Sequence, residues 1–256
     1  MDLSSHVRAF QAAYRGPTSN VSFRQRVDST NEVARRLVSA FLADEETPLR
    51  MLLIALEQTA GRGRLGRVWS SPRGQGLYAS LVLPAVERDQ LATLPMRAAV
   101  GLSRGVEELG AQPCRVKWPN DLLVGKSKIG GILIETVARG DEPPIAIIGA
   151  GVNYGQPPED VGERAVTSIQ RESPQAAEFA VASATLVAAL EKALEEAPPV
   201  AEYAARSAHR PGDVLVCRVG DKIVHGDFVG FDENGFLRLR GPAGERVLSS
   251  AEVIEG

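Results

Sequence analysis

The sequence is poor in the residues that build metal centres and disulfide frameworks. Its 256 residues include only two cysteines, Cys114 and Cys217, and three histidines. None of these residues has the spacing of a zinc or iron site, and two distant cysteines form no disulfide framework. We therefore expect no metal ligands in the protein, and we expect both cysteines to be buried as small apolar side chains.

Long apolar runs are also missing. No stretch reaches the roughly 18 apolar residues of a membrane helix, and MDLSSHVRAFQAAYRG at the N-terminus contains no apolar signal core. We therefore expect a cytoplasmic protein that does not bind membranes. The net charge of −3 gives no general attraction to nucleic acid, so an anion site must come from a local cluster of cations.

Apolar periodicity predicts a chain that mixes strands and helices. Ser29 and Glu32 have the spacing of a capping box at a helix start, and Pro95 suits the first turn of another helix. Strands are expected at 21–27, 49–56, 76–84, 114–118, 122–137 (two strands around a turn) and 145–153. Helices are expected at 3–14, after DSTN, from Pro95 to Gly110, at 174–196 and within 198–208.

The pattern changes near the C-terminus. From Pro211 onward, short strand patterns are separated by turns, including Asn234–Gly235. Asn-Gly between alternating segments is a strong hairpin signal. The sequence therefore predicts two domains, a larger one over residues 1–208 and a small β-barrel over residues 211–256.

The stretch GRGRLGRVW, residues 61–69, spells G-x-G-x-x-G through Gly61, Gly63 and Gly66. This dinucleotide fingerprint requires a strand before it and a helix that opens at it. Here a strand precedes the glycines, but the segment after them is rich in proline and glycine and leads into another strand. The context excludes a Rossmann loop.

Arg62, Arg64 and Arg67 lie between and beside these glycines. An Arg guanidinium stays charged and presents a planar fork of donors that fits phosphate, and glycine lets backbone N–H groups approach a ligand. Without an anion, three arginines so close in sequence would repel one another. The loop therefore predicts an anion site, with a solvated arginine-rich loop as the alternative.

Further polar motifs occur where strands or helices begin and end. In KWPND, Lys117 and Asn120 could contact phosphate, but Asp121 could equally cap a turn. DSTN places hydroxyl groups at a helix start, where they could bind a polar ligand or form a plain N-cap. Asn153 in GVN could bind ribose or phosphate, or belong to a turn.

The segment KSKIGGIL places Lys128 beside Gly130 and Gly131. The lysine is suited to a carboxylate that becomes an acyl phosphate, and paired glycines admit a ligand against the backbone. A hairpin with a bulge is the alternative interpretation.

In order, DSTN, EQTAGRGRLGRVW, KWPND, KIGGIL and GVN resemble the catalytic domain of biotin protein ligases (biotin–acetyl-CoA-carboxylase ligases). The resemblance runs from about residue 21 to the C-terminus, where the chain is similar to the family's small SH3-like barrel. It implies an α+β fold with a mixed β-sheet flanked by helices, akin to class II aminoacyl-tRNA synthetases and lipoate ligases.

The resemblance implies an ATP-dependent ligase. Biotin and ATP would form biotinyl-5′-AMP, with Mg²⁺ on the phosphates, and biotin would pass to a lysine of a biotin carboxyl carrier protein. Because residues 1–20 are too few for a DNA-binding domain, no repressor role and no DNA partner are expected. A lipoate or octanoate ligase and a non-catalytic biotin- or nucleotide-binding protein are the alternatives, and a homodimer stays open.

The resemblance also assigns the site, in which Arg64, Lys128 and Lys117 are the expected catalytic cations. Trp69 would stack on adenine, or pack in the core instead, and Asp121 could accept a proton from the acceptor lysine. The biotin-binding set is Ser29, Thr30, Asn31, Gln58, Gly61, Arg62, Gly63, Arg64, Lys128, Gly130 and Gly131. The set for ATP or adenylate is Arg64, Arg67, Trp69, Lys117, Asn120, Lys128 and Asn153.

Overall fold

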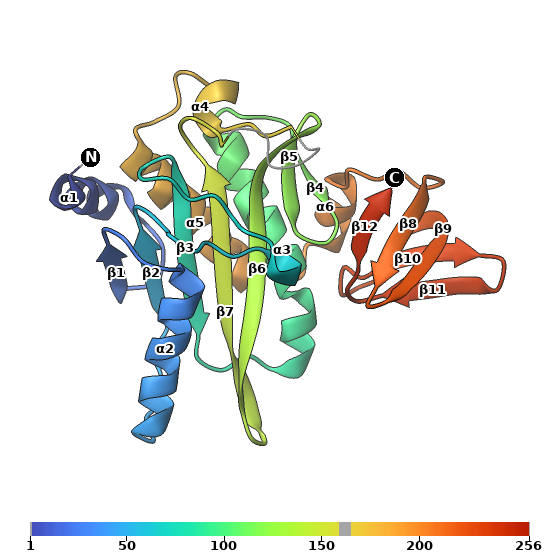
Figure 1. Ribbon diagram of the computed structural model, residues 1–256, viewed down its shortest axis with the longest axis horizontal. Helices are drawn as coiled ribbons and strands as arrows, with labels where there is room; N and C mark the ends of the chain where they lie inside the picture. The colour runs from blue at the N-terminus through green and yellow to red at the C-terminus, as the bar shows by residue number, and fades with distance from the viewer. Residues whose placement is uncertain (1, 159–164, 256) are drawn as a thin grey trace.

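A seven-stranded mixed sheet forms the larger part of the molecule (Figure 1), and the computed structural model describes residues 2–158 and 165–255. The strand order is β1-β2-β3-β7-β6-β5-β4, in which β1 and β2 are parallel and the other neighbours are antiparallel. The strands are β1 (Val21–Arg24), β2 (Met51–Ala55), β3 (Gly76–Leu83), β4 (Cys114–Lys117), β5 (Asp121–Val124), β6 (Ser127–Arg139) and β7 (Glu142–Asn153). The expected mixed sheet is confirmed.

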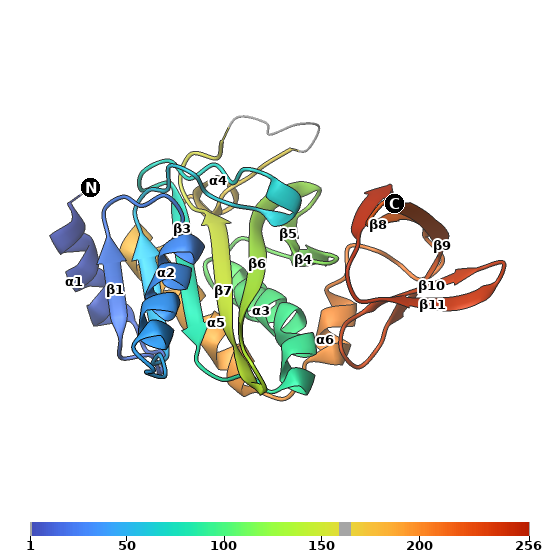
Figure 2. The same cartoon turned by 60° about the horizontal axis from the view of Figure 1, so that its bottom comes forward.

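Helices cover both faces of this sheet (Figures 1 and 2). One face packs against α2, and the other packs against α3, which in turn lies along α5. A Cβ on Gly101 of α3 would lie 2.7 Å from the carbonyl oxygen of Ala189, so these two helices approach closely because that position is glycine. The helices are α1 (Leu3–Ala13), α2 (Thr30–Ala43), α3 (Arg88–Glu108), α4 (Ile169–Glu172), α5 (Phe179–Glu195) and α6 (Val200–Ala205).

A second, five-stranded antiparallel sheet follows α6, in the order β11-β10-β9-β8-β12. The Asn234–Gly235 turn joins β9 to β10 as expected, and Gly235 has a φ of 78°, which favours glycine. The two sheets meet where the indole nitrogen of Trp118 donates to the Gly235 carbonyl at 3.2 Å. The strands are β8 (Val214–Val219), β9 (Lys222–Phe231), β10 (Leu237–Gly241), β11 (Gly244–Leu248) and β12 (Glu252–Glu255). The exact domain boundary stays a prediction.

Two helix starts differ from the prediction. α3 begins at Arg88 and contains Pro95, because Asp89 suits its first turn and Leu91 already packs against the core. α5 begins at Phe179 and not at residue 174. A short helix that the sequence did not predict, α4, precedes it.

The capping box expected at the start of α2 is also wrong. Ser29 is the N-cap residue, but its side chain makes no capping hydrogen bond. Instead, the Thr30 N–H donates to Oε1 of Gln58 at 2.8 Å, while Glu32 contacts Arg62. A full opposite charge attracts Glu32 more strongly than a neutral backbone N–H would.

One buried carboxylate ties the N-terminal segment to the core. Glu191 of α5 is 0% exposed and accepts hydrogen bonds from the hydroxyl groups of Tyr14 and Thr18. Nη2 of Arg50 donates to it at 3.1 Å. Each hydroxyl belongs to the segment between α1 and β1, so this one acid fixes that segment against α5 and the start of β2.

We expect Glu191→Ala to lower the free energy of unfolding by about 3–5 kcal/mol, because the Tyr14 and Thr18 hydroxyls and the Arg50 guanidinium lose their shared buried acceptor. Glu195→Ala is the matched control, since Glu195 pairs with the same Arg50 at 3.2 Å but is 54% exposed. The control should cost less than about 1 kcal/mol. Urea denaturation of both variants tests this, and equal losses would contradict the role given to Glu191.

Candidate functional site

A cavity of about 700 Å³ lies between the large sheet, the loop that joins β2 to β3, and β12 of the second sheet. The loop crosses in front of β7 and β6 and carries the short 3-10 helix η1 (Arg64–Gly66) (Figure 1). The structure brings most of the predicted site residues together here. The predicted residues that line the cavity are Ser29, Thr30, Asn31, Gln58, Arg62, Gly63, Arg64, Arg67, Trp69, Lys117, Asn120, Lys128, Gly131 and Asn153.

Two predicted ligand contacts, Gly61 and Gly130, lie behind the cavity lining. A Cβ on Gly61 would lie 2.4 Å from the carbonyl oxygen of Trp69, and one on Gly130 would lie 2.9 Å from that of Gly151. Both glycines therefore let one backbone segment approach another. Chain packing alone accounts for glycine at both positions.

The glycine–arginine loop is a small hairpin. Arg62 and Val68 form an antiparallel bridge, and the Gly63 N–H donates to the Arg67 carbonyl at 2.7 Å. No helix starts at the glycine motif in the described part of the chain; η1 is one turn, and β3 follows. The loop therefore lacks the helix that a dinucleotide fingerprint needs, as its context predicted.

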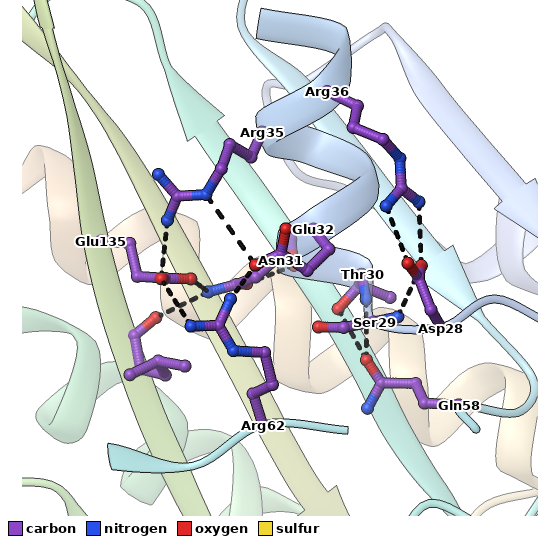
Figure 3. Close-up of polar contacts among 12 residues, drawn as sticks. Asp28, Ser29, Thr30, Asn31, Glu32, Arg35, Arg36, Gln58, Arg62 and Glu135 are labelled. Carbon is purple, nitrogen blue, oxygen red and sulfur yellow. Dashed lines mark hydrogen bonds and ion pairs between the residues drawn. The ribbon is translucent and has the colours of Figure 1, made fainter. Parts of the chain in front are cut away.

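Acidic side chains compensate two of the three loop arginines. Arg62 contacts Glu32 of α2 and lies 3.5 Å from a carboxylate oxygen of Glu135 on β6 (Figure 3). Arg67 contacts Glu252 of β12. Protein carboxylates therefore offset the charge of Arg62 and Arg67, while the expected repulsion persists between Arg67 and Arg64, whose pKa is lowered by burial and, to a lesser extent, by the charge of Arg67.

Arg64 differs from its two neighbours in the kind of partner it has. Its guanidinium donates to neutral oxygen atoms: Ser250 Oγ at 2.9 Å, the Ala251 carbonyl at 3.4 Å and Asn120 Oδ1 at 3.5 Å. Among the residues that the structure describes, none forms an ion pair with it. Burial lowers the pKa of Arg64, an effect that the charge of Asp121 opposes. A cation held this way is suited to receive an anion.

Lys128 lies on the cavity wall between an acid and an aromatic ring. Its Nζ is 2.6 Å from Oδ1 of Asp121, the first residue of β5, and 5.3 Å from the centre of the Trp69 ring. The sequence left open whether Asp121 caps a turn or accepts a proton from the acceptor lysine. In the structure its carboxylate pairs with Lys128, which was predicted to be catalytic.

The polar side chains on the sheet side of the cavity are mostly engaged with each other. The Asn31 amide donates to Glu135 at 2.8 Å and accepts from Ser80 at 2.6 Å (Figure 3). Gln58 accepts from Thr30, and its amide donates to Ser71 at 2.8 Å. These two amides therefore fix their neighbours, in addition to any contact with a ligand.

The Ser29 hydroxyl differs from these amides. It is buried in the cavity wall and makes no hydrogen bond to any residue in the described ranges. Since the residue lines the cavity, its hydroxyl is suited to bond a polar group of a ligand.

Two asparagines connect the site to more distant segments. The Asn120 amide donates to the Ile132 carbonyl at 2.9 Å, and the Asn153 amide donates to the Thr167 carbonyl at 3.0 Å. Both side chains line the cavity and hold its walls. Lys117 also lines the cavity. Burial lowers the pKa of His209, and the positive charge of Lys117 lowers it further.

The Trp69 indole packs against a glycine pair on the sheet. Gly131 of β6 and Gly151 of β7 are directly opposite one another, and a Cβ on Gly151 would lie 2.7 Å from the indole Nε1. That nitrogen is buried and has no hydrogen-bond partner among the described residues. The sheet can hold the indole at this position only because side chains are missing there.

Sequence reasoning missed the acids that hold the loop. Glu32 carried a signal, since it lies in the first turn of the helix that follows DSTN. Glu135 and Glu252 carried none, because they lie on strands far away in the sequence and reach the arginines only through the fold.

Comparison with known proteins agrees with this geometry. The model of the biotin/lipoate A/B protein ligase family matches residues 23–153, and that of the biotin protein ligase C terminal domain matches residues 213–254. The chain belongs to the biotin protein ligase family. The second match covers the small C-terminal sheet.

Individual relatives match most of this chain. The biotin–[acetyl-CoA-carboxylase] ligase of Paracoccus denitrificans is 34% identical over 90% of this chain and 98% of its own length. The bifunctional ligase/repressor BirA of Bacillus subtilis is 31% identical over 84% of this chain and 69% of its own length.

Solved structures show the same fold. The biotin protein ligase of Aquifex aeolicus in complex with biotin and ATP is 26% identical, with a TM-score of 0.73 over 92% of this chain and 97% of that chain. The Leishmania major ligase in complex with biotinyl-5-AMP is 25% identical, with a TM-score of 0.62 over 91% of this chain and 100% of that chain. The expected α+β ligase fold is confirmed.

We expect Gly151→Ala to displace the Trp69 indole, because a methyl group cannot lie 2.7 Å from its ring atoms. Gly131→Ala is the control, since its Cβ would meet Trp69 at 3.6 Å, an ordinary contact. Tryptophan fluorescence should shift to longer wavelength in the first variant only. Identical spectra for both variants would show that Trp69 does not rest on Gly151.

Proposed function

We propose that the chain joins biotin to ATP as biotinyl-5′-AMP and then transfers the biotinyl group to a lysine of a biotin carboxyl carrier protein. The observation that carries the proposal is Arg64, a half-buried cation with neutral hydrogen-bond partners, in a cavity of about 700 Å³. The similarity to biotin ligases along both parts of the chain supports the substrates.

In the first step, an oxygen of the biotin carboxylate bonds to the α-phosphorus of ATP, and the bond to the β-phosphate oxygen breaks to release pyrophosphate. Carboxylate and triphosphate repel each other, so the site must supply positive charge. We assign this role to Arg64 and Lys128. A guanidinium about 4 Å from a phosphate gains about 4 kcal/mol at an effective dielectric constant near 20, before desolvation. Alignment of the two reacting groups lowers the barrier further.

The remaining residues take roles that follow their contacts. We assign the Ser29 and Thr30 hydroxyls to the biotin head group, with Asn31 and Gln58 holding that wall. Trp69 would leave the glycine pair to stack on adenine. We assign Arg62 to hold the loop in position, and Gly63 and Gly131 to allow close packing on the ligand. The residues assigned to phosphate or ribose are Arg67, Lys117, Asn120 and Asn153.

In the second step, the lysine amine of the acceptor attacks the acyl carbon, and AMP leaves. The amine must first lose a proton, since a free lysine has a pKa near 10.4. We assign Asp121 to orient this amine or to accept its proton, because the carboxylate lines the cavity. Closure of the loop over the cavity would keep water from the adenylate.

Magnesium is proposed as part of the nucleotide substrate. Among the residues that the structure describes, no group of three His, Cys, Asp or Glu side chains could hold a metal ion. The triphosphate and water would then supply the ligands, as Mg²⁺ commonly prefers. No step above is routed through the ion.

Location and assembly stay predictions. In the described chain, no helix has the length and apolar character to span a membrane. In a homodimer, a second copy could pair with β1, which lies at one edge of the large sheet. The strand at the opposite edge, β4, already forms a bridge between Val116 and Ser207.

The proposal predicts that the purified protein exchanges labelled pyrophosphate into ATP only when biotin is present. Lipoate in place of biotin is the control that separates the two ligase classes. Exchange with lipoate alone would overturn the choice of substrate, and absence of exchange with either acid would overturn catalysis of the first step.

We also expect Arg64→Met to speed release of labelled biotinyl-5′-AMP by about tenfold to hundredfold, since it removes a charge-assisted hydrogen bond worth about 1.5–3 kcal/mol. Arg67→Met is the comparison, because Arg67 already has Glu252 as its partner and should matter less. Release that is faster in the Arg67 variant would contradict the special role of Arg64.

A further inference from the structure

Three exposed apolar side chains line the cavity. Leu65 is 69% exposed, Val68 is 76% exposed and Ile254 is 38% exposed, and all three border the cavity. A single exposed apolar residue needs no explanation, but a group of them around one opening indicates a surface that another molecule covers. We call these three residues the apolar rim.

The backbone of Leu65 is unusual for its side chain. Its φ is 56° and its ψ is 34°, the left-handed conformation that costs a residue other than glycine about 1–2 kcal/mol. The side chain gains little burial in return, since Leu65 is 69% exposed. Neither the fold nor the phosphate chemistry requires leucine at this position. A strained and exposed leucine therefore suggests a contact outside this chain.

Contacts between the loop and the second sheet join the rim into one surface. Leu65 and Val68 belong to the loop, and Ile254 belongs to β12. Arg67 contacts Glu252 of that strand, and Arg64 donates to Ser250 just before it. The Arg67–Glu252 ion pair places charged groups beside the apolar rim. Protein interfaces commonly combine an apolar centre with a polar edge in this way.

We propose that the apolar rim docks the acceptor protein, through apolar side chains that flank its target lysine. This inference rests on the proposed function. The acceptor amine must reach an acyl-adenylate inside the cavity, and a lysine side chain is only four carbons long. The acceptor backbone on both sides of the lysine therefore comes against the mouth, where the rim presents apolar surface.

The test uses Leu65→Asn, because asparagine tolerates the left-handed conformation while it removes the apolar surface. Val214→Ser is the matched control: Val214 is 62% exposed, but it lies on β8 and does not line the cavity. Three rates are measured for each variant: biotin-dependent pyrophosphate exchange, transfer to hydroxylamine, and transfer to a purified biotin carboxyl carrier domain.

For Leu65→Asn, we expect exchange and hydroxylamine transfer to stay within about twofold of the parent, since neither needs docking. The KM for the carrier domain should rise about tenfold, as expected for loss of an interface contact. The control should change none of the three. A carrier KM equal to that of the control would overturn the inference, and so would a matching loss in the hydroxylamine reaction.

A second arm tests direct contact. The residues on either side of the target lysine in the carrier domain are replaced by serine. This altered carrier is assayed with the parent enzyme and with the Leu65→Asn enzyme. If the rim touches them, the two changes together should raise KM by little more than either alone. Fully additive effects would overturn direct contact. Absence of exchange in the parent protein would instead refute the proposed function.

Discussion

The site depends on how charge is balanced across the glycine–arginine loop. Acids from α2 and β6 hold Arg62, and an acid from β12 holds Arg67. These ion pairs fasten the loop over the cavity from two different sheets. Between them, Arg64 keeps neutral partners, and its charge is therefore available to an anion. The loop can carry three cations because only one of them lacks a carboxylate in contact with it.

The same loop packs Trp69 against a part of the sheet where two neighbouring strands carry glycine. Gly131 and Gly151 form a cross-strand pair without side chains, and Trp69 fills that space. Strands usually carry side chains on both faces, so a glycine pair in the sheet weakens it locally and creates room for a flat ring.

Much of the fold could be predicted from local patterns. The strands from β1 to β7 follow alternating or continuous apolar runs, and the Asn234–Gly235 hairpin follows turn chemistry. The errors arose where distant partners compete with local ones. Glu32 pairs with Arg62 and forms no capping box, and α3 continues through Pro95 because residues before it pack on the core.

By itself, the sequence determined the family, the order of the strands and most of the predicted site residues that line the cavity, because these depend on periodicity and short motifs. Only the tertiary structure decided which cation is available. That choice depends on Glu135 and Glu252, which approach the loop through sheet pairing and not through sequence proximity. Electrostatic attraction falls with distance in space, and distance along the chain does not report it.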